Sequence, residues 1–203
     1  MKCNVGDVSL EIPEGYTQID DEEVPPECVA FFTQTPSANC AVQLQPSGRD
    51  ECMPFDEPQV VIDGIHGALG EKQGLVDVKA GSEKQGRFIY SIVKSQNEPS
   101  GMLYILTMDL EVSTHYVRLQ GWFNEAGTTG IRDSTVFAMR LKSNLSDFER
   151  IHEGWVQDPY DKDFVRGALM NESEKEEFDE AFPDHPLSVA RRFASDIVKA
   201  NLH

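Results

Sequence analysis

The run Gly101–Glu111 constrains the fold of this chain more than any other segment. Every second residue in it is large and apolar, and from Thr107 onward the intervening residues are polar; the apolar set is Met102, Tyr104, Leu106, Met108 and Leu110. A two-residue period is that of a β-strand with one face in the core. The next segment, Glu111–Thr114, is short enough to turn the chain back into a second strand-like run at His115–Phe123. The pair predicts an antiparallel sheet.

Other segments extend this pattern to an α+β domain. Further strand-like runs, bounded by turn residues, are Val5–Ile12, Cys28–Thr33, Cys40–Gln45, Leu75–Lys79 and Gly86–Lys94. Apolar stripes at helical spacing predict one helix over about Glu57–Gly70, capped by Asp56, and another from Thr128 or Thr129 to Leu141. We therefore expect an antiparallel β-sheet with helices packed on it.

The pattern changes near residue 148, where we place a domain boundary. Residues 1–148 form the predicted sheet domain, and residues 149–203 form a helical C-terminal extension with short helices at Asp161–Arg166, Ser173–Ala181 and Pro186–Ala200. The last of these has an apolar stripe, made by Leu187, Ala190, Ala194 and Ile197, so it should pack on the sheet domain. Residues 1–148 are expected to fold without the extension but to lose solubility.

Three segments resemble a known fold. The turn Leu10–Tyr16, with the sequence Leu-Glu-Ile-Pro-Glu-Gly-Tyr, the strand Tyr116–Gly121 and the helix end Phe137–Ser143 are similar to the Mog1/PsbP-like fold, which includes the DcrB-type domains of bacteria. The resemblance covers roughly residues 5–145. It implies a binding scaffold, because members look like assembly factors, G-protein partners or effector chaperones and share no catalytic set, so no functional residue is carried over.

Charge and cysteine content bear on the compartment and the partners. The net charge of -17 repels polyanions, so we expect no nucleic-acid partner, and no apolar run is long enough for membrane insertion. The N-terminal segment lacks the apolar core of a signal peptide, which predicts a cytoplasmic protein. The four cysteines form no CxxC pair, and we expect free thiols at Cys3, Cys28, Cys40 and Cys52.

No cofactor or metal site is predicted. The five histidines are scattered, without an HxH or HExxH pair, and the glycines of residues 64–74 are not followed by the Lys-Ser/Thr of a phosphate loop. The sequence does not indicate an oligomeric state.

Two functional hypotheses remain. The first is a non-catalytic binding, assembly or chaperone-like protein that docks a protein partner on its sheet face or on its extension. Its candidate residues lie in and beside the corner Phe182–Ser188: His185, and the adjacent basic pair Arg191 and Arg192, which we expect to be exposed. At this corner Asp184 or Ser188 should cap the last helix.

The second hypothesis is an enzyme whose active site is assembled from dispersed residues around the strand-like runs Gly101–Glu111 and His115–Phe123. Its candidate residues are Asp109, Glu111, His115 and Arg118. A deep pocket enclosing at least two of these side chains would favour the enzyme, and an exposed apolar groove would favour binding.

Overall fold

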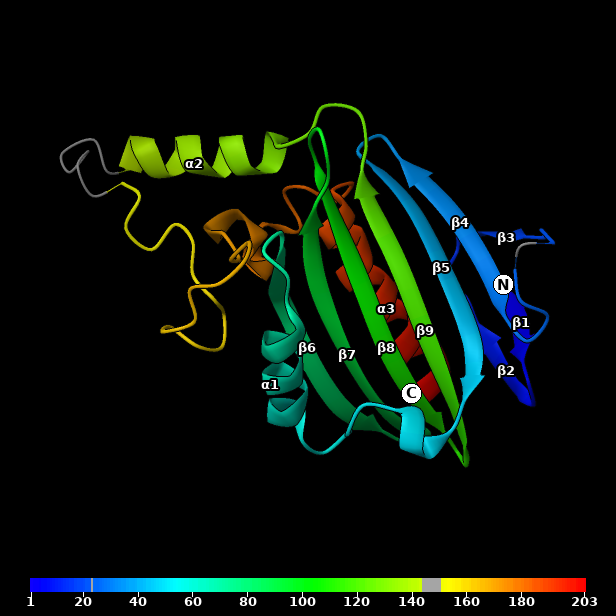
Figure 1. Cartoon of the computed structure of the whole chain (residues 1–203). Helices are drawn as coiled ribbons and strands as arrows, with labels where there is room; N and C mark the ends of the chain where they lie inside the picture. The colour runs from blue at the N-terminus through cyan, green and yellow to red at the C-terminus, as the bar shows by residue number, and fades with distance from the viewer. Residues whose placement is uncertain (23, 144–150) are drawn as a thin grey trace.

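A seven-stranded antiparallel sheet forms the centre of the computed structural model, which describes residues 1–22, 24–143 and 151–203 (Figure 1). The strand order is β3-β4-β5-β9-β8-β7-β6. The strands are β3 (Thr17–Ile19), β4 (Val29–Thr35), β5 (Ala38–Ser47), β6 (Gln73–Glu83), β7 (Gly86–Gln96), β8 (Met102–Val112) and β9 (His115–Glu125). The α+β class and the antiparallel sheet predicted from the sequence are confirmed.

A separate two-stranded sheet precedes the large one and corrects one prediction. The run Val5–Ile12 is not a single strand, because the chain reverses at Gly6, whose φ is +56°, and forms a hairpin of β1 (Lys2–Val5) and β2 (Val8–Glu11). Glycine readily adopts a positive φ, and the buried positions change phase across the turn, from Cys3 and Val5 in β1 to Val8 and Leu10 in β2.

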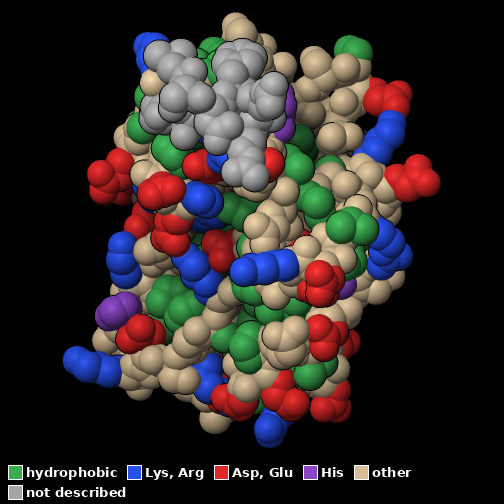
Figure 2. Space-filling model, turned by 90° about the vertical axis from the view of Figure 1, so that its left-hand side faces the viewer, with side chains coloured by type: hydrophobic (Ala, Val, Ile, Leu, Met, Phe, Trp, Pro, Cys, Tyr) green, Lys and Arg blue, Asp and Glu red, His purple; other side chains and the backbone are tan. Residues whose placement is uncertain are grey.

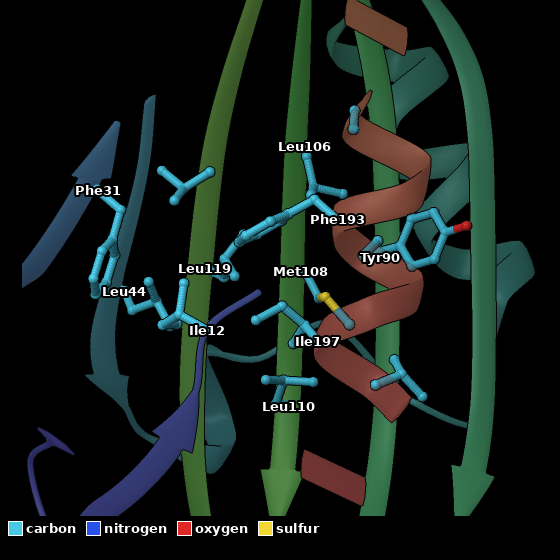
Figure 3. Packing of buried hydrophobic residues seen from close by; sticks show 14 of the residues in the cluster. Ile12, Phe31, Leu44, Tyr90, Leu106, Met108, Leu110, Leu119, Phe193 and Ile197 are labelled. Carbon is cyan, nitrogen blue, oxygen red and sulfur yellow. The ribbon is translucent and has the colours of Figure 1, made fainter. Parts of the chain in front are cut away.

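The helix α3 (Pro186–Leu202) packs on one face of the large sheet. The ring of Phe193 and the side chain of Ile197 lie against Leu106, Met108 and Leu119 of β8 and β9 (Figure 3). Both α3 side chains are at most 2% exposed. The apolar stripe predicted for the last helix therefore belongs to the main core of the protein.

The helix α1 (Pro58–Ala68) packs on the opposite face, over the β6 side of the sheet. Val61 and Ile62 of α1 form a second, smaller core with Leu75, Val78 and Ile89. The predicted cap is wrong here. Glu57 occupies the capping position without a side-chain bond, and the Asp56 carboxylate instead accepts a bond of 2.7 Å from Arg87.

The helix α2 (Ile131–Ser143) extends away from the top of the sheet in Figure 1. Within residues 151–203, Pro186–Leu202 is the only full helix, whereas Asp161–Arg166 is non-helical and residues 172–178 form two short 3-10 turns, η3 (Glu172–Glu174) and η4 (Glu176–Phe178). The Asp158 carboxylate accepts two backbone N–H groups and Asp161 one, and such local bonds compete with helix formation. The boundary near residue 148 lies outside the described residues, and the division of the chain there stays a prediction.

All four cysteines carry free thiols in the structure. Burial raises the pKa of the fully buried Cys40 thiol to about 12. None of the helices in the described part of the chain is long and apolar enough to cross a membrane.

Candidate functional site

The corner Phe182–Ser188 encloses a cavity of about 200 Å³ beside the start of α3. The His185 ring lies 8% exposed, with its Nε2 atom 3.5 Å from Glu125 Oε1 at the end of β9. His185, not Asp184 or Ser188, caps the helix, because its Nδ1 accepts the backbone N–H of Leu187. Burial alone would raise the pKa of Glu125, but hydrogen bonds from His185 and from backbone N–H groups lower it overall. The carboxylate is thus held in its charged form.

Arg132, from the first turn of α2, fills the floor of this corner and is 1% exposed. Its guanidinium donates to the backbone carbonyls of Ser173 and Lys175, to Ser188 Oγ at 2.8 Å and to Asp179 Oδ1 at 3.0 Å. Because its donors already have protein partners, Arg132 joins α2, the 3-10 turns and α3 together and is not positioned to bind an anionic ligand.

Arg191 is buried, which corrects the prediction that it is exposed. It is 7% exposed and lies between two carboxylates, with Nε 3.2 Å from Asp77 and Nη1 3.3 Å from Asp179. Burial favours the neutral form, but Asp179 and Asp77 raise the pKa of Arg191 overall. Arg192 is exposed and donates to the Pro183 carbonyl at 3.0 Å. A docking role for His185, Arg191 and Arg192 stays a prediction, and of the three only Arg192 is exposed.

This arrangement predicts different outcomes for two neighbouring substitutions. Arg191→Ala leaves the Asp77 carboxylate without its buried cation, whereas Asp179 keeps its bond from Arg132, and the change should destabilise the fold by about 2 kcal/mol. Arg192→Ala removes one exposed bond and should change stability by less than about 0.5 kcal/mol. Urea unfolding of both variants measures the difference, and equal midpoints would show that the Arg191 pairs contribute nothing.

The four residues of the enzyme hypothesis do not form an open site. Asp109 is fully buried, accepts two bonds from Arg118 at 2.8 and 2.9 Å, and accepts the Met53 N–H at 2.7 Å. Glu111 accepts a bond from Arg87, whereas His115 lies exposed beside the β8–β9 turn. Among the described residues, none of these four lines the corner cavity or the cavities along α3. Their geometry is that of cross-strand ion pairs.

A buried ion pair that the sequence did not single out lies under the corner. Lys94 of β7 donates to Glu174 of η3 at 2.6 Å, with the two side chains 4% and 0% exposed. Glu174 also accepts the Tyr104 hydroxyl at 2.8 Å and the Asn171 N–H at 2.7 Å. These bonds fix the segment after α2 to the sheet.

The face of the sheet opposite α3 is the more open surface. Strand alternation puts three same-face rows there across β4, β5, β9 and β8: Ala30, Gln43, Gln120 and Thr107; Phe32, Ala41, Trp122 and Ile105; Gln34, Asn39, Asn124 and Leu103. We call these rows the open face. Figure 1 shows α3 behind the sheet; in front of these four strands it draws only the short 3-10 turn η1 (Arg49–Glu51), at their lower end, where Arg118 donates to the Glu51 carbonyl. Phe32 is 39% exposed, and Trp122 and Ile105 are partly exposed.

Every side chain in the three rows is uncharged, although charged residues make up 26% of the chain. The middle row is apolar and contains two aromatic rings, and the rows on either side contain two and three amide side chains. Charge depletion with aromatic enrichment distinguishes the centre of protein interfaces from other surface. The sequence predicts a sheet face as one possible docking surface, but the row itself depends on the register of four strands.

Comparisons with known proteins were limited. No protein-family model matches the sequence, and no curated protein matches it. One similar solved structure is PA94, a protein of unknown function from Pseudomonas aeruginosa, at 12% identity and a TM-score of 0.36, covering 78% of this chain and 97% of PA94. Another is cyanobacterial PsbP from Synechocystis sp. PCC 6803, at 13% identity and a TM-score of 0.34, covering 70% of this chain and 82% of that protein. The chain has a weak Mog1/PsbP-like resemblance, and nothing about function is transferred from either protein.

Proposed function

We propose that this chain is a non-catalytic binding protein that docks a protein partner on the open face. The observation that carries the proposal is the row Phe32, Ala41, Trp122 and Ile105, an apolar stripe that crosses four adjacent strands and is not covered by a helix of the described chain. Contiguous exposed apolar surface with a polar rim is typical of interaction sites. Adjacent strands lie about 4.8 Å apart, so the stripe is roughly 14 Å long.

The chemistry of the surface indicates the kind of partner. The stripe requires apolar side chains, and the amide rows on both sides, about 6.8 Å away, can bond to polar groups of the partner. The loop between β3 and β4, at the edge of the open face, exposes Asp20, Glu22 and Glu27. With a net charge of -17 on the chain, these acidic residues favour a segment that carries Lys or Arg beside its apolar side chains. The proposed occupant is therefore an apolar, basic-flanked segment of another protein.

The ion pairs described above argue against the enzyme alternative. Asp109, Glu111 and Arg118 are each held by another side chain, so none is poised as a general acid or base. A binding role needs no such group.

A designed peptide tests the proposal. The probe is a fluorescently labelled peptide with leucines grouped in one stretch and lysines at both ends. The full chain is titrated into this peptide, and binding is measured by fluorescence anisotropy. Replacing an interface centre commonly costs 2 kcal/mol or more, so Trp122→Asp should weaken binding by roughly 30-fold or more. Phe32→Ala should weaken it to a smaller extent.

Two controls separate docking from charge attraction. A peptide of the same composition, with leucines and lysines interspersed, should bind weakly. Val60→Asp, at a 53% exposed position of α1 away from the open face, should leave affinity unchanged. Equal affinity of both peptides, or equal loss in the Val60 and Trp122 variants, would contradict the proposed surface.

A further inference from the structure

We propose that the exposed half of strand β6 is a second binding site, which takes an extended peptide as an added strand and one of its large apolar side chains in the neighbouring cavity. β6 is an edge strand of the sheet, on the side of the molecule that faces the viewer in Figure 2, where hydrophobic side chains reach the surface between basic and acidic ones. The site lies on the opposite side of the sheet from the open face and is independent of it.

The hydrogen bonds of Val78 show which backbone groups of β6 point away from β7. Both the N–H and the carbonyl of Val78 bond to the Tyr160 hydroxyl, so this residue points its backbone polar groups away from β7. In an antiparallel pair the direction alternates with every residue. Ala80 and Ser82 therefore direct their N–H and carbonyl groups outward as well, and both residues are exposed.

The chain itself covers the other half of this edge. The Gln73 carbonyl accepts the Ala168 N–H, and Tyr160 occupies the groups of Val78. In the part of the chain that the structure describes, this cover ends before Ala80. The protein thus pairs its long edge strand over Gln73–Val78 and leaves Lys79–Glu83 as a template for another strand.

A cavity of about 260 Å³ opens directly beside the exposed half, between β6 and α3. Its floor is apolar, formed by Phe88, Tyr90, Ala194 and Val198, and its rim carries side chains of both charge signs, among them Lys79 and Glu83. Gly81 of β6 faces the same side, and a Cβ there would lie 2.7 Å from the Phe88 ring. In strand addition the backbone bonds give affinity, and a pocket for alternate side chains gives selectivity.

Selection from a library of random linear peptides displayed on phage, with the full chain as target, tests the site. We expect enriched peptides that share one large apolar residue within an extended, β-favouring stretch. Ala80→Pro removes an outward N–H without breaking a bond to β7, and Ser195→Trp fills the cavity from an exposed position on α3. Each substitution should lower the affinity for the selected peptide by about tenfold or more, while Ala80→Ser and Ser195→Ala should leave the affinity unchanged.

Amide hydrogen exchange locates the peptide. Binding should slow exchange at Ala80 and Ser82, and circular dichroism should show both variants folded. The proposal is overturned if no peptide is enriched, if the Ala80→Pro and Ser195→Trp proteins bind as tightly as the parent, or if protection falls elsewhere. Protection of Ala80 and Ser82 that grows with protein concentration in the absence of peptide would identify a second copy of the chain as the occupant and would also overturn it.

Discussion

Ending the chain after residue 148 should abolish cooperative unfolding. This truncation removes Leu187, Phe193 and Ile197, which are at most 2% exposed in the main core. Burial of each such side chain contributes about 1.5–3 kcal/mol. The sum is comparable with the whole stability of an ordinary domain, about 5–15 kcal/mol. Urea unfolding followed by circular dichroism would show a gradual change without a sigmoidal transition.

The sequence alone predicts a milder result, in which residues 1–148 fold and lose only solubility. We expect a larger loss of stability because α3 lies deep in the main core. Lys199→Ala, on the exposed side of α3, is the matched control and should unfold like the parent chain. A sigmoidal transition of the shortened chain at the parent's midpoint would show that the extension is an independent module.

Lys94→Met should have the largest effect of any single substitution on the buried polar groups. It leaves the Glu174 carboxylate, which is fully buried, with neutral donors only, from Tyr104 and Asn171. Removing one partner of a buried ion pair destabilises by about 3–5 kcal/mol. Thermal and urea unfolding would measure the loss.

The double variant Lys94→Met with Glu174→Gln distinguishes an unpaired charge from lost packing. The amide is neutral and can still bond to Asn171 and Tyr104, so part of the lost stability should return. If the double variant is no more stable than Lys94→Met alone, the buried charge is not the cause of the loss.

Local sequence patterns predicted most of the sheet and its burial. The two-residue period of β8 correctly placed Tyr104, Leu106 and Met108 on the α3 side and Asp109 on the opposite face, because alternation in a strand is a local property, but it did not predict that Asp109 is fully buried there. The stripe of α3 was predicted for the same reason. The hairpin at Gly6 was missed because Val5 is the only residue of β1 in the run Val5–Ile12, and the rest of that run alternates like a single strand.

The candidate site was predicted only in outline, since its residues come together through long-range contacts. Arg191 was expected to be exposed because an arginine usually is, but its partner Asp77 lies 114 positions earlier in the chain. Lys94 and Glu174 are likewise 80 positions apart. The stripe through Phe32, Ala41 and Trp122 exists only in the register of β4, β5 and β9, which the sequence does not specify.

Hydroxyl-radical footprinting of the full chain, alone and with the leucine and lysine peptide, tests most directly whether the open face is the docking surface. Phe32 and Trp122, both accessible in the unbound chain, should be oxidised when the chain is alone and protected when the peptide is bound, whereas Val60 on α1 should react equally in both samples. Unchanged oxidation of Phe32 and Trp122 in a sample shown by anisotropy to be saturated with peptide would contradict this account.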